Sequence, residues 1–308
     1  MTSADPIAEA ALFEVEQPPP VSLADKFGVP PMSVLDRRSG EWQDRKRAWL
    51  SLGMTSDDGR GDALTFARSG GLDPVSQKLL AISPTSVFDP VLCELAYRWF
   101  SRPGAVVLDP FAGGSVRGLV ASTLARWYYG VDIRPEQVAA NCAQADIASD
   151  ITPTWLVGDA TRLHETTGLP DEVDLVFSCP PYADLEVYSD DPRDISTWPY
   201  ELFVEGHAKA IRDAVSRLRP DRYAVWVIGD VRDPRSGAYR GLVAETARAF
   251  RATGCHFLNE FITVDMAPSA GLRAERPFVA NRKATKVHQN LLVFVKGDIR
   301  RAAQWVTA

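Results

Sequence analysis

The six residues Phe-Ser-Cys-Pro-Pro-Tyr, at positions 177–182, combine a thiol, two rigid prolines and an aromatic ring. Two kinds of chemistry fit this combination. Cys179 is a candidate nucleophile, because a thiolate attacks electrophilic carbon. Alternatively, the prolines fix the direction of backbone carbonyl acceptors, and the ring of Tyr182 offers a flat stacking surface. The two interpretations describe different enzymes, so the elements around the loop must decide between them.

Strands and helices are expected to alternate around this loop. Apolar runs bounded by acids or glycines predict strands at 105–111, 128–133, 154–160, 173–182, 222–230 and 288–297. Apolar residues at helical spacing predict helices at 86–100, 115–126, 135–147, 207–218 and 239–254. This alternation predicts an α/β fold built on a parallel, doubly wound sheet. Ligands of such sheets bind beyond the carboxyl ends of the strands.

Three successive predicted strands end in an acid, namely Asp109, Asp132 and Asp159. After Asp109 comes a glycine-rich turn whose small residues let a cofactor approach the backbone, and we expect Asp109 to face that crevice. Asp132 ends the next strand, where nucleoside-binding sheets place a carboxylate that accepts hydrogen bonds from ribose hydroxyls. One such acid is also typical of a helix N-cap. Three in succession favour a bound nucleoside.

Four segments, taken in order, resemble the motifs of S-adenosylmethionine-dependent DNA amino-methyltransferases. They are Asp-Pro-Phe-Ala-Gly-Gly-Ser (109–115), Gly-Val-Asp-Ile (130–133), Gly-Asp-Ala (158–160) and Cys-Pro-Pro-Tyr (179–182). The resemblance covers roughly residues 86–297. It implies a Rossmann-like class I methyltransferase fold, here with an N-terminal extension, and S-adenosylmethionine as the cofactor. A softer resemblance, through the leader Phe-Gly-Val-Pro-Pro, is to methylases encoded by phages and prophages, and it brings restriction-modification into consideration.

The resemblance also implies which residues hold the cofactor. In the family the glycine-rich turn surrounds the methionine part, the acid after the second strand holds the ribose, and the acid after the third contacts the adenine. By position, the cofactor-binding residues are Asp109, Pro110, Phe111, Ala112, Gly113, Gly114, Asp132, Ile133, Asp159 and Ala160.

Catalysis falls, by the same resemblance, to the Pro-Pro-Tyr loop, with the residues Ser178, Cys179, Pro180, Pro181 and Tyr182. In the family, the residue before Pro-Pro and the first proline's carbonyl accept the hydrogens of an exocyclic amine, while the aromatic ring stacks on a base flipped out of the duplex. Fixed acceptors suit an amine whose lone pair is delocalised into the ring. Cys179 stands where the family has Asp, Asn or Ser, and a thiol is a weak acceptor. Likeness to the Ser-Pro-Pro-Tyr of cytosine-N4 enzymes favours cytosine N4 slightly over adenine N6.

Three alternatives stay open. Cys179 as a covalent nucleophile describes a cytosine-C5 methyltransferase, with Glu186 as its acid, although the Pro-Cys-Gln and Glu-Asn-Val signatures of that family are absent. RNA methyltransferases also use Pro-Pro-Tyr loops. The departure at Cys179 is compatible, finally, with a catalytically inactive DNA-binding protein on the same scaffold.

Composition divides the chain into three parts. Residues 1–24 carry four acids and no base, which predicts a flexible acidic tail. Residues 25–85 predict a helical leader and linker, in which Trp42 and Trp49 share a helical face and are expected to dock onto the main domain. Residues 86–300 predict the methyltransferase domain.

Charge and cysteine usage limit the partners. The net charge is −6, yet residues 217–288 carry thirteen Lys or Arg against seven Asp or Glu. Basic loops around 231–286, at 231–241 and 266–286, are therefore predicted to contact the phosphates of double-stranded DNA. Four scattered cysteines without metal-ligand spacing predict reduced thiols and no metal. No export signal or membrane-length apolar run is found, so a cytoplasmic location without a membrane partner is expected.

Overall fold

The computed structural model describes residues 22–54, 88–147, 151–183, 188–264 and 270–308. The chain divides into two units, Met1–Pro31 and Met32–Ala308. The smaller unit contains helix α1 (Leu23–Phe27), which begins with a capping box between Ser22 and Asp25. Most of the predicted acidic tail and the linker from residue 55 lie outside the described residues.

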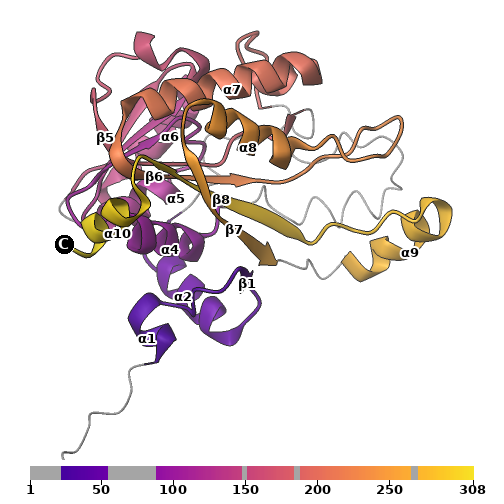
Figure 1. Cartoon of the computed structure of the whole chain (residues 1–308), viewed down its shortest axis with the longest axis horizontal. Coiled ribbons are helices and arrows are strands. Elements are labelled where there is room, and N and C mark those ends of the chain that lie inside the picture. The colour runs from indigo at the N-terminus through magenta and orange to yellow at the C-terminus, as the bar shows by residue number, and fades with distance from the viewer. Residues whose placement is uncertain (1–21, 55–87, 148–150, 184–187, 265–269) are drawn as a thin grey trace, which may run out of the picture. The chain divides into compact units, whose positions relative to one another are not determined.

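An eight-stranded sheet organises the described part of the larger unit (Figure 1). Its strands, in spatial order, are β1 (Val34–Asp36), β7 (His256–Val264), β8 (His288–Lys296), β6 (Leu218–Ile228), β5 (Val173–Ser178), β2 (Val106–Asp109), β3 (Trp127–Asp132) and β4 (Thr154–Val157). From β2 the chain builds outward through β3 and β4, and from β5 it builds outward in the opposite direction. The topological switch point therefore lies between β2 and β5. The predicted doubly wound, Rossmann-like α/β fold is confirmed.

The expectation of a wholly parallel sheet is wrong at β8, which runs antiparallel to both β6 and β7. β7 itself is not predicted by the sequence pattern. Asn259 and Glu260 are exposed, and the register with β8 shifts between Phe257 and Asn259, so no clean alternation marks this strand. Helix α9 (Ala270–Asn281) connects β7 to β8. The chain reverses through it, and β8 enters between β7 and β6.

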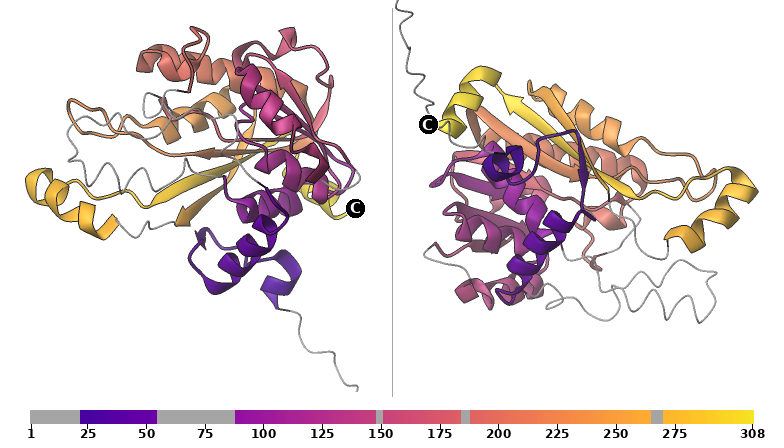
Figure 2. Two further views of the ribbon diagram at one scale, coloured as in Figure 1. Left: turned by 180° about the vertical axis from the view of Figure 1, so that it is seen from behind. Right: turned by 90° about the horizontal axis from the view of Figure 1, so that it is seen from below.

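Helices cover both faces of the sheet (Figures 1 and 2). α7 (Tyr200–Arg217) and α8 (Leu242–Ala252) pack together on one face, and α4 (Pro90–Phe100) and α5 (Val116–Thr123) pack together on the other. Because both faces are covered, every residue of the central strand β5 is buried. The remaining elements are α6 (Pro135–Cys142), α10 (Ile299–Thr307) and the short 3-10 helices η2 (Ala145–Ile147), η3 (Ala160–Glu165) and η5 (Ile195–Thr197). Among the described helices, none has the length and apolar character of a bilayer span.

Leader residues from Met32 onward belong to the larger unit. β1 pairs with the edge of β7, and α2 (Gly40–Leu50) packs against α4. The indole N–H of Trp42 donates to Asp89 at 3.2 Å, and that of Trp49 donates to Glu94 at 2.8 Å. The predicted docking by these tryptophans is confirmed, and carboxylates on and before α4 fix their orientation.

Candidate active site

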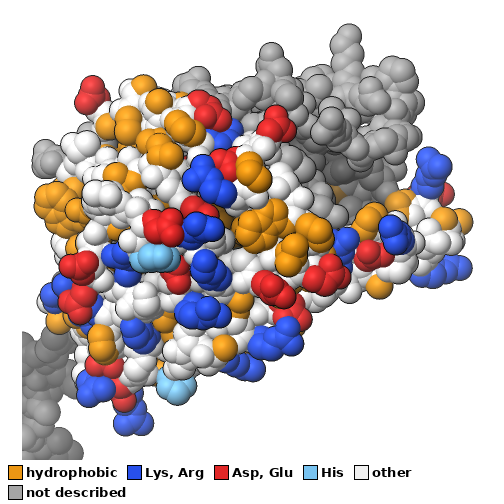
Figure 3. All heavy atoms as spheres, turned by 90° about the horizontal axis from the view of Figure 1, so that it is seen from above, with side chains coloured by type: hydrophobic (Ala, Val, Ile, Leu, Met, Phe, Trp, Pro, Cys, Tyr) orange, Lys and Arg blue, Asp and Glu red, His pale blue; other side chains and the backbone are white. Residues whose placement is uncertain are grey.

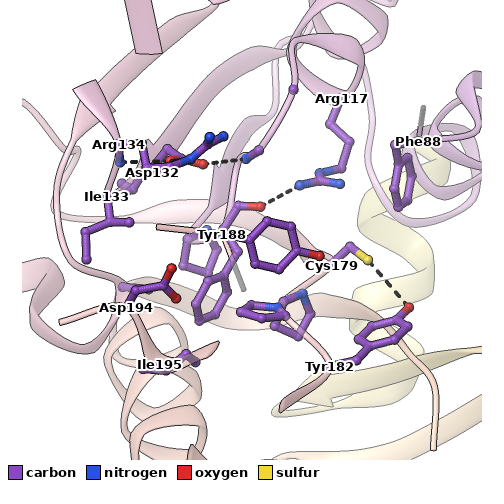
Figure 4. A pocket seen from close by; sticks show the side chains of 18 of the residues that line it. Phe88, Arg117, Asp132, Ile133, Arg134, Cys179, Tyr182, Tyr188, Asp194 and Ile195 are labelled. Atoms are coloured by element: carbon purple, nitrogen blue, oxygen red, sulfur yellow. Dashed lines mark hydrogen bonds and ion pairs between the residues drawn. The ribbon is translucent and has the colours of Figure 1, made fainter. Parts of the chain in front are cut away.

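A cavity of about 210 Å³ opens at the topological switch point of the sheet (Figure 4). Most of its wall comes from the segments that follow the carboxyl ends of β2, β3, β4 and β5, and the leader, the start of α4 and β8 contribute the rest. The sequence-predicted residues that line it are Pro110, Phe111, Gly113, Gly114, Asp132, Ile133, Asp159, Ala160, Cys179, Pro180, Pro181 and Tyr182. The fold thus joins the glycine-rich turn and the Pro-Pro-Tyr loop in one cavity.

Asp109 does not line this cavity, and the expectation that it faces the crevice is wrong. Its carboxylate is fully buried and accepts four hydrogen bonds. The donors are Arg117 Nε at 2.5 Å, Ser178 Oγ at 2.6 Å, Tyr128 Oη at 2.8 Å and the Phe111 N–H at 3.2 Å. Asp109 therefore holds the turn in place from beneath.

Ser178 and Ala112 are also fully buried and away from the cavity. The Ser178 hydroxyl donates to Asp109 and accepts the Phe111 N–H at 3.2 Å, so it links β5 to the turn. The Ala112 N–H donates to the Val131 carbonyl at 2.8 Å. Neither residue lines the cavity, and both help to hold the glycine-rich turn in place.

Arg117, on α5, is a site residue that the sequence does not reveal. Its Nη2 donates to the carbonyls of Phe111 at 2.6 Å and Ala112 at 2.9 Å, and its guanidinium lies 4.6 Å from the centre of the Phe88 ring. Together with the ion pair to Asp109, these contacts satisfy a charge that would be costly to bury alone. Arg117 consequently fixes the backbone of the glycine-rich turn.

Asp132 faces the cavity and carries a perturbed carboxyl group. Its oxygens accept the N–H groups of Gly113 and Arg134, each at 2.9 Å. Burial raises the pKa of Asp132 to about 6, against the opposing effect of these backbone donors. Gly113 has φ +51°, and among the described residues no atom beyond its chain neighbours lies within 4 Å of the position a Cβ would take. The glycine-rich turn therefore leaves space beside Gly113, and the Asp132 carboxylate next to it can accept hydrogen bonds from a ligand in that space.

Asp159 combines the two roles weighed for it in the sequence. It is the N-cap of η3, accepting the Thr161 N–H at 2.7 Å, and it also lines the cavity. Beside it, Ala160 and Ile133 contribute apolar wall. This part of the cavity suits a flat group that makes few hydrogen bonds.

The Pro-Pro-Tyr loop is held through the Tyr182 hydroxyl (Figure 4). Gln289 Nε2, on β8, donates to Tyr182 Oη at 3.1 Å, and Cys179 Sγ lies 3.6 Å from the same oxygen. Because the amide supplies its own proton, the hydroxyl proton of Tyr182 can point to the sulfur. Behind the ring, a Cβ on Gly229 would lie 3.2 Å from Tyr182 Cε2. Gln289 is a second site residue that the sequence does not reveal.

The far wall follows the Pro-Pro-Tyr loop in the chain. Tyr188, Arg193, Asp194 and Ile195 line it, and Asp194 caps η5 by accepting the Ser196 N–H at 2.9 Å. Glu186, the proposed acid of a C5 mechanism, lies outside the described residues.

The two predicted basic segments meet, but one of them is not a loop. Residues 270–281 form helix α9, since Ala270, Ala274 and Glu275 favour helix despite the internal Pro277. A Cβ on Gly237, in the 231–241 segment, would overlap Lys283 Nζ, which shows that the segments touch. Figure 3 shows Lys and Arg side chains both at the α9 end and across the rest of this face, with acidic side chains between them.

Comparisons with known proteins give no match to a family model and none to a curated protein. Among solved structures, the chain is similar to TrmN from Thermus thermophilus (20% identity, TM-score 0.48, 74% of this chain and 55% of that chain covered). It is also similar to a methyltransferase from Pyrococcus furiosus (13%, 0.46, 70% and 87%). A third is magnesium protoporphyrin IX methyltransferase from Synechocystis PCC 6803 with bound SAM (14%, 0.45, 75% and 93%). The chain spans only about half of TrmN, and likenesses this distant carry no argument about activity.

Proposed function

We propose that the chain is an S-adenosylmethionine-dependent DNA methyltransferase. It transfers a methyl group to an exocyclic amine of a flipped base, cytosine N4 or adenine N6, with cytosine slightly favoured. The observation that carries this proposal is the single cavity at the switch point, shared by the glycine-rich turn, Asp132 and the Cys179–Tyr182 loop.

The cavity fits the cofactor by its donors, acceptors and free space. The Asp132 carboxylate suits the two ribose hydroxyls, and the open space beside Gly113 suits a group that must approach the backbone. Ile133 and Ala160, next to Asp159, suit the adenine ring. When bound, the cofactor supplies a methyl group on a positively charged sulfur, which is already activated toward nucleophiles.

The chain's own contribution to catalysis is the geometry of the Pro-Pro-Tyr loop. The carbonyl of Pro180 accepts a hydrogen of the target amine, which localises electron density on its nitrogen. Tyr182 stacks on the flipped base and offsets part of the ~few kcal/mol cost of unstacking it. Cys179, held by its contact with Tyr182, accepts the other amine hydrogen. It stands where the family that this loop resembles has Asp, Asn or Ser, and its thiol is a weaker acceptor than those groups.

Double-stranded DNA is the proposed substrate because of the two basic segments of the larger unit. Arg235, Arg276 and Arg282 are exposed in the two basic segments, Lys283 lies against Gly237, and all four suit phosphate contacts. Phe278 and Val279 are also exposed, by 49% and 66%. Apolar side chains beside basic ones suit a surface that contacts both bases and phosphates.

The product of methyl transfer tests the function. The purified chain of 308 residues is incubated with methyl-labelled S-adenosylmethionine and one nucleic acid at a time. The nucleic acids are amplified unmethylated genomic DNA, the same DNA after denaturation, and total RNA. Nucleoside mass spectrometry is expected to detect N4-methylcytosine or N6-methyladenine in the duplex sample. The Tyr182→Ala variant serves as the inactive control. Label only in RNA favours the RNA enzyme, and 5-methylcytosine favours the C5 enzyme. DNA binding without cofactor affinity favours the inactive protein.

Gln289→Leu is expected to reduce methyl transfer about three- to tenfold, because one hydrogen bond that orients Tyr182 contributes about 0.5–1.5 kcal/mol. The loss is expected in the turnover rate, with cofactor affinity unchanged. In a Tyr182→Phe background the same substitution is expected to have no effect, since the hydroxyl it acts through is gone. Equal losses in both backgrounds contradict the assignment.

A further inference from the structure

The leader contributes one side chain to the cavity, and that side chain is Arg37. Backbone hydrogen bonds fix the segment around it to β7 at the sheet edge. The Ser33 carbonyl accepts the Ile262 N–H at 2.7 Å, and the Arg37 N–H donates to the Val264 carbonyl at 3.2 Å. β1 therefore ends where the guanidinium of Arg37 enters the cavity wall. The side chain is 10% exposed, so its place is set by packing.

Asp89 holds the guanidinium in a defined orientation. Its Oδ2 accepts Arg37 Nε at 3.1 Å and Nη2 at 2.9 Å. The same carboxylate caps α4 through the Val91 N–H at 3.0 Å, and it accepts the Trp42 indole at 3.2 Å. The Nε and Nη2 atoms of Arg37 are thus fixed at the start of α4, and Arg37 lines the cavity.

Through its pair with Asp89, Arg37 belongs to the part of the cavity wall next to Phe88. Figure 4 shows Phe88 across the cavity from Asp132 and Ile133, and Asp89, the partner of Arg37, follows Phe88 directly. If the ribose hydroxyls bind Asp132 and the base lies beside Ile133 and Ala160, the space left for the 5′ substituent is the part of the cavity next to Phe88. In S-adenosylmethionine that substituent ends in an amino acid, and its carboxylate is the cofactor's only carboxylate.

We propose that Arg37 is a cofactor-binding residue that receives this carboxylate, an inference that rests on the proposed function. A planar guanidinium, already oriented by Asp89, is the side chain best matched to a carboxylate. Arg117, the other arginine near Phe88, directs its nitrogens to Asp109 and to the turn carbonyls. The leader accordingly contributes a binding residue, Arg37, to the cofactor site.

Calorimetry with three ligands tests the assignment. S-adenosylhomocysteine carries the carboxylate, its decarboxylated analogue keeps only the amine, and 5′-methylthioadenosine lacks both. Arg37→Gln is expected to weaken S-adenosylhomocysteine binding about 10- to 100-fold, as the loss of a charge-assisted hydrogen bond should. Binding of the other two ligands is expected to stay within about threefold of wild type. Arg37→Lys is expected to recover part of the loss.

Arg45→Gln is the matched control. Arg45 is also a leader arginine, and it forms an ion pair with Glu94 on α4, but it does not line the cavity. It is expected to leave all three affinities unchanged. If Arg37→Gln weakens all three ligands equally, or none of them, Arg37 has only a structural role and the inference is overturned. If the wild-type chain binds none of the three ligands, the proposed function itself fails.

Discussion

Replacing Asp132 with alanine is expected to lower the affinity for S-adenosylhomocysteine by at least about 100-fold. On the proposed function, Asp132 accepts two hydrogen bonds from ribose hydroxyls, and the variant loses both, each contributing about 1.5–3 kcal/mol. It also releases the N–H groups of Gly113 and Arg134, which the carboxylate now orients. Calorimetry measures the affinity, and thermal unfolding checks that the variant is folded.

The affinity is also expected to depend on pH through this residue. Because burial raises the pKa of Asp132 to about 6, the ionised acceptor is lost as the pH falls below that value. Binding is expected to weaken toward tenfold per pH unit below about pH 6 and to be flat above it. Asp132→Asn, which cannot ionise, is expected to remove this dependence. A wild-type affinity that stays constant between pH 5 and pH 8 contradicts the proposed role.

The same carboxyl group links pH to the stability of the ligand-free chain. Its pKa in the folded state lies above the ordinary value of 3.8. Its contribution to the free energy of unfolding is therefore fully present below pH 3.8 and is lost as the pH rises through about 6. Asp132 thus makes the ligand-free chain less stable at neutral pH. A ligand that donates hydrogen bonds to the ionised group offsets that cost.

Cys179→Ser is expected to retain methyl transfer within about tenfold of wild type, since a hydroxyl is at least as good a hydrogen-bond acceptor as a thiol. The contact with Tyr182, now 3.6 Å from sulfur to oxygen, can be replaced by an oxygen–oxygen hydrogen bond. Single-turnover kinetics on duplex DNA measures the rate without interference from product release.

Covalent catalysis predicts the opposite result for the same variant. Removal of a nucleophile costs several orders of magnitude, on the order of 1000-fold or more. A stable adduct between the wild-type chain and duplex DNA containing 5-fluorocytosine, seen on a denaturing gel, is the second signature of that route. Cys255→Ser, a buried thiol outside the cavity, controls for general effects of losing a cysteine.

Much of the cavity lining was predictable because its motifs are local. A strand end, a glycine-rich turn and a helix start are neighbours in the chain, and the doubly wound fold brings the carboxyl ends of parallel strands to one edge. Asp132, Asp159 and the Pro-Pro-Tyr loop therefore line one cavity, as their order in the sequence indicates. Local spacing says less about the direction of a side chain. Asp109 turns inward because Arg117 and Tyr128 offer it buried donors.

The sequence by itself determined the α/β class, the alternation of elements and the residues at the strand ends, because hydrophobic period and turn chemistry are properties of short segments. Only the tertiary structure decided the antiparallel course of β8, the helical state of 270–281 and the partners of the motif residues. Gln289 meets Tyr182 across 107 positions, and Arg37 meets Asp89 across 52. Such pairs form because separate elements pack together, and no local pattern records which elements will do so.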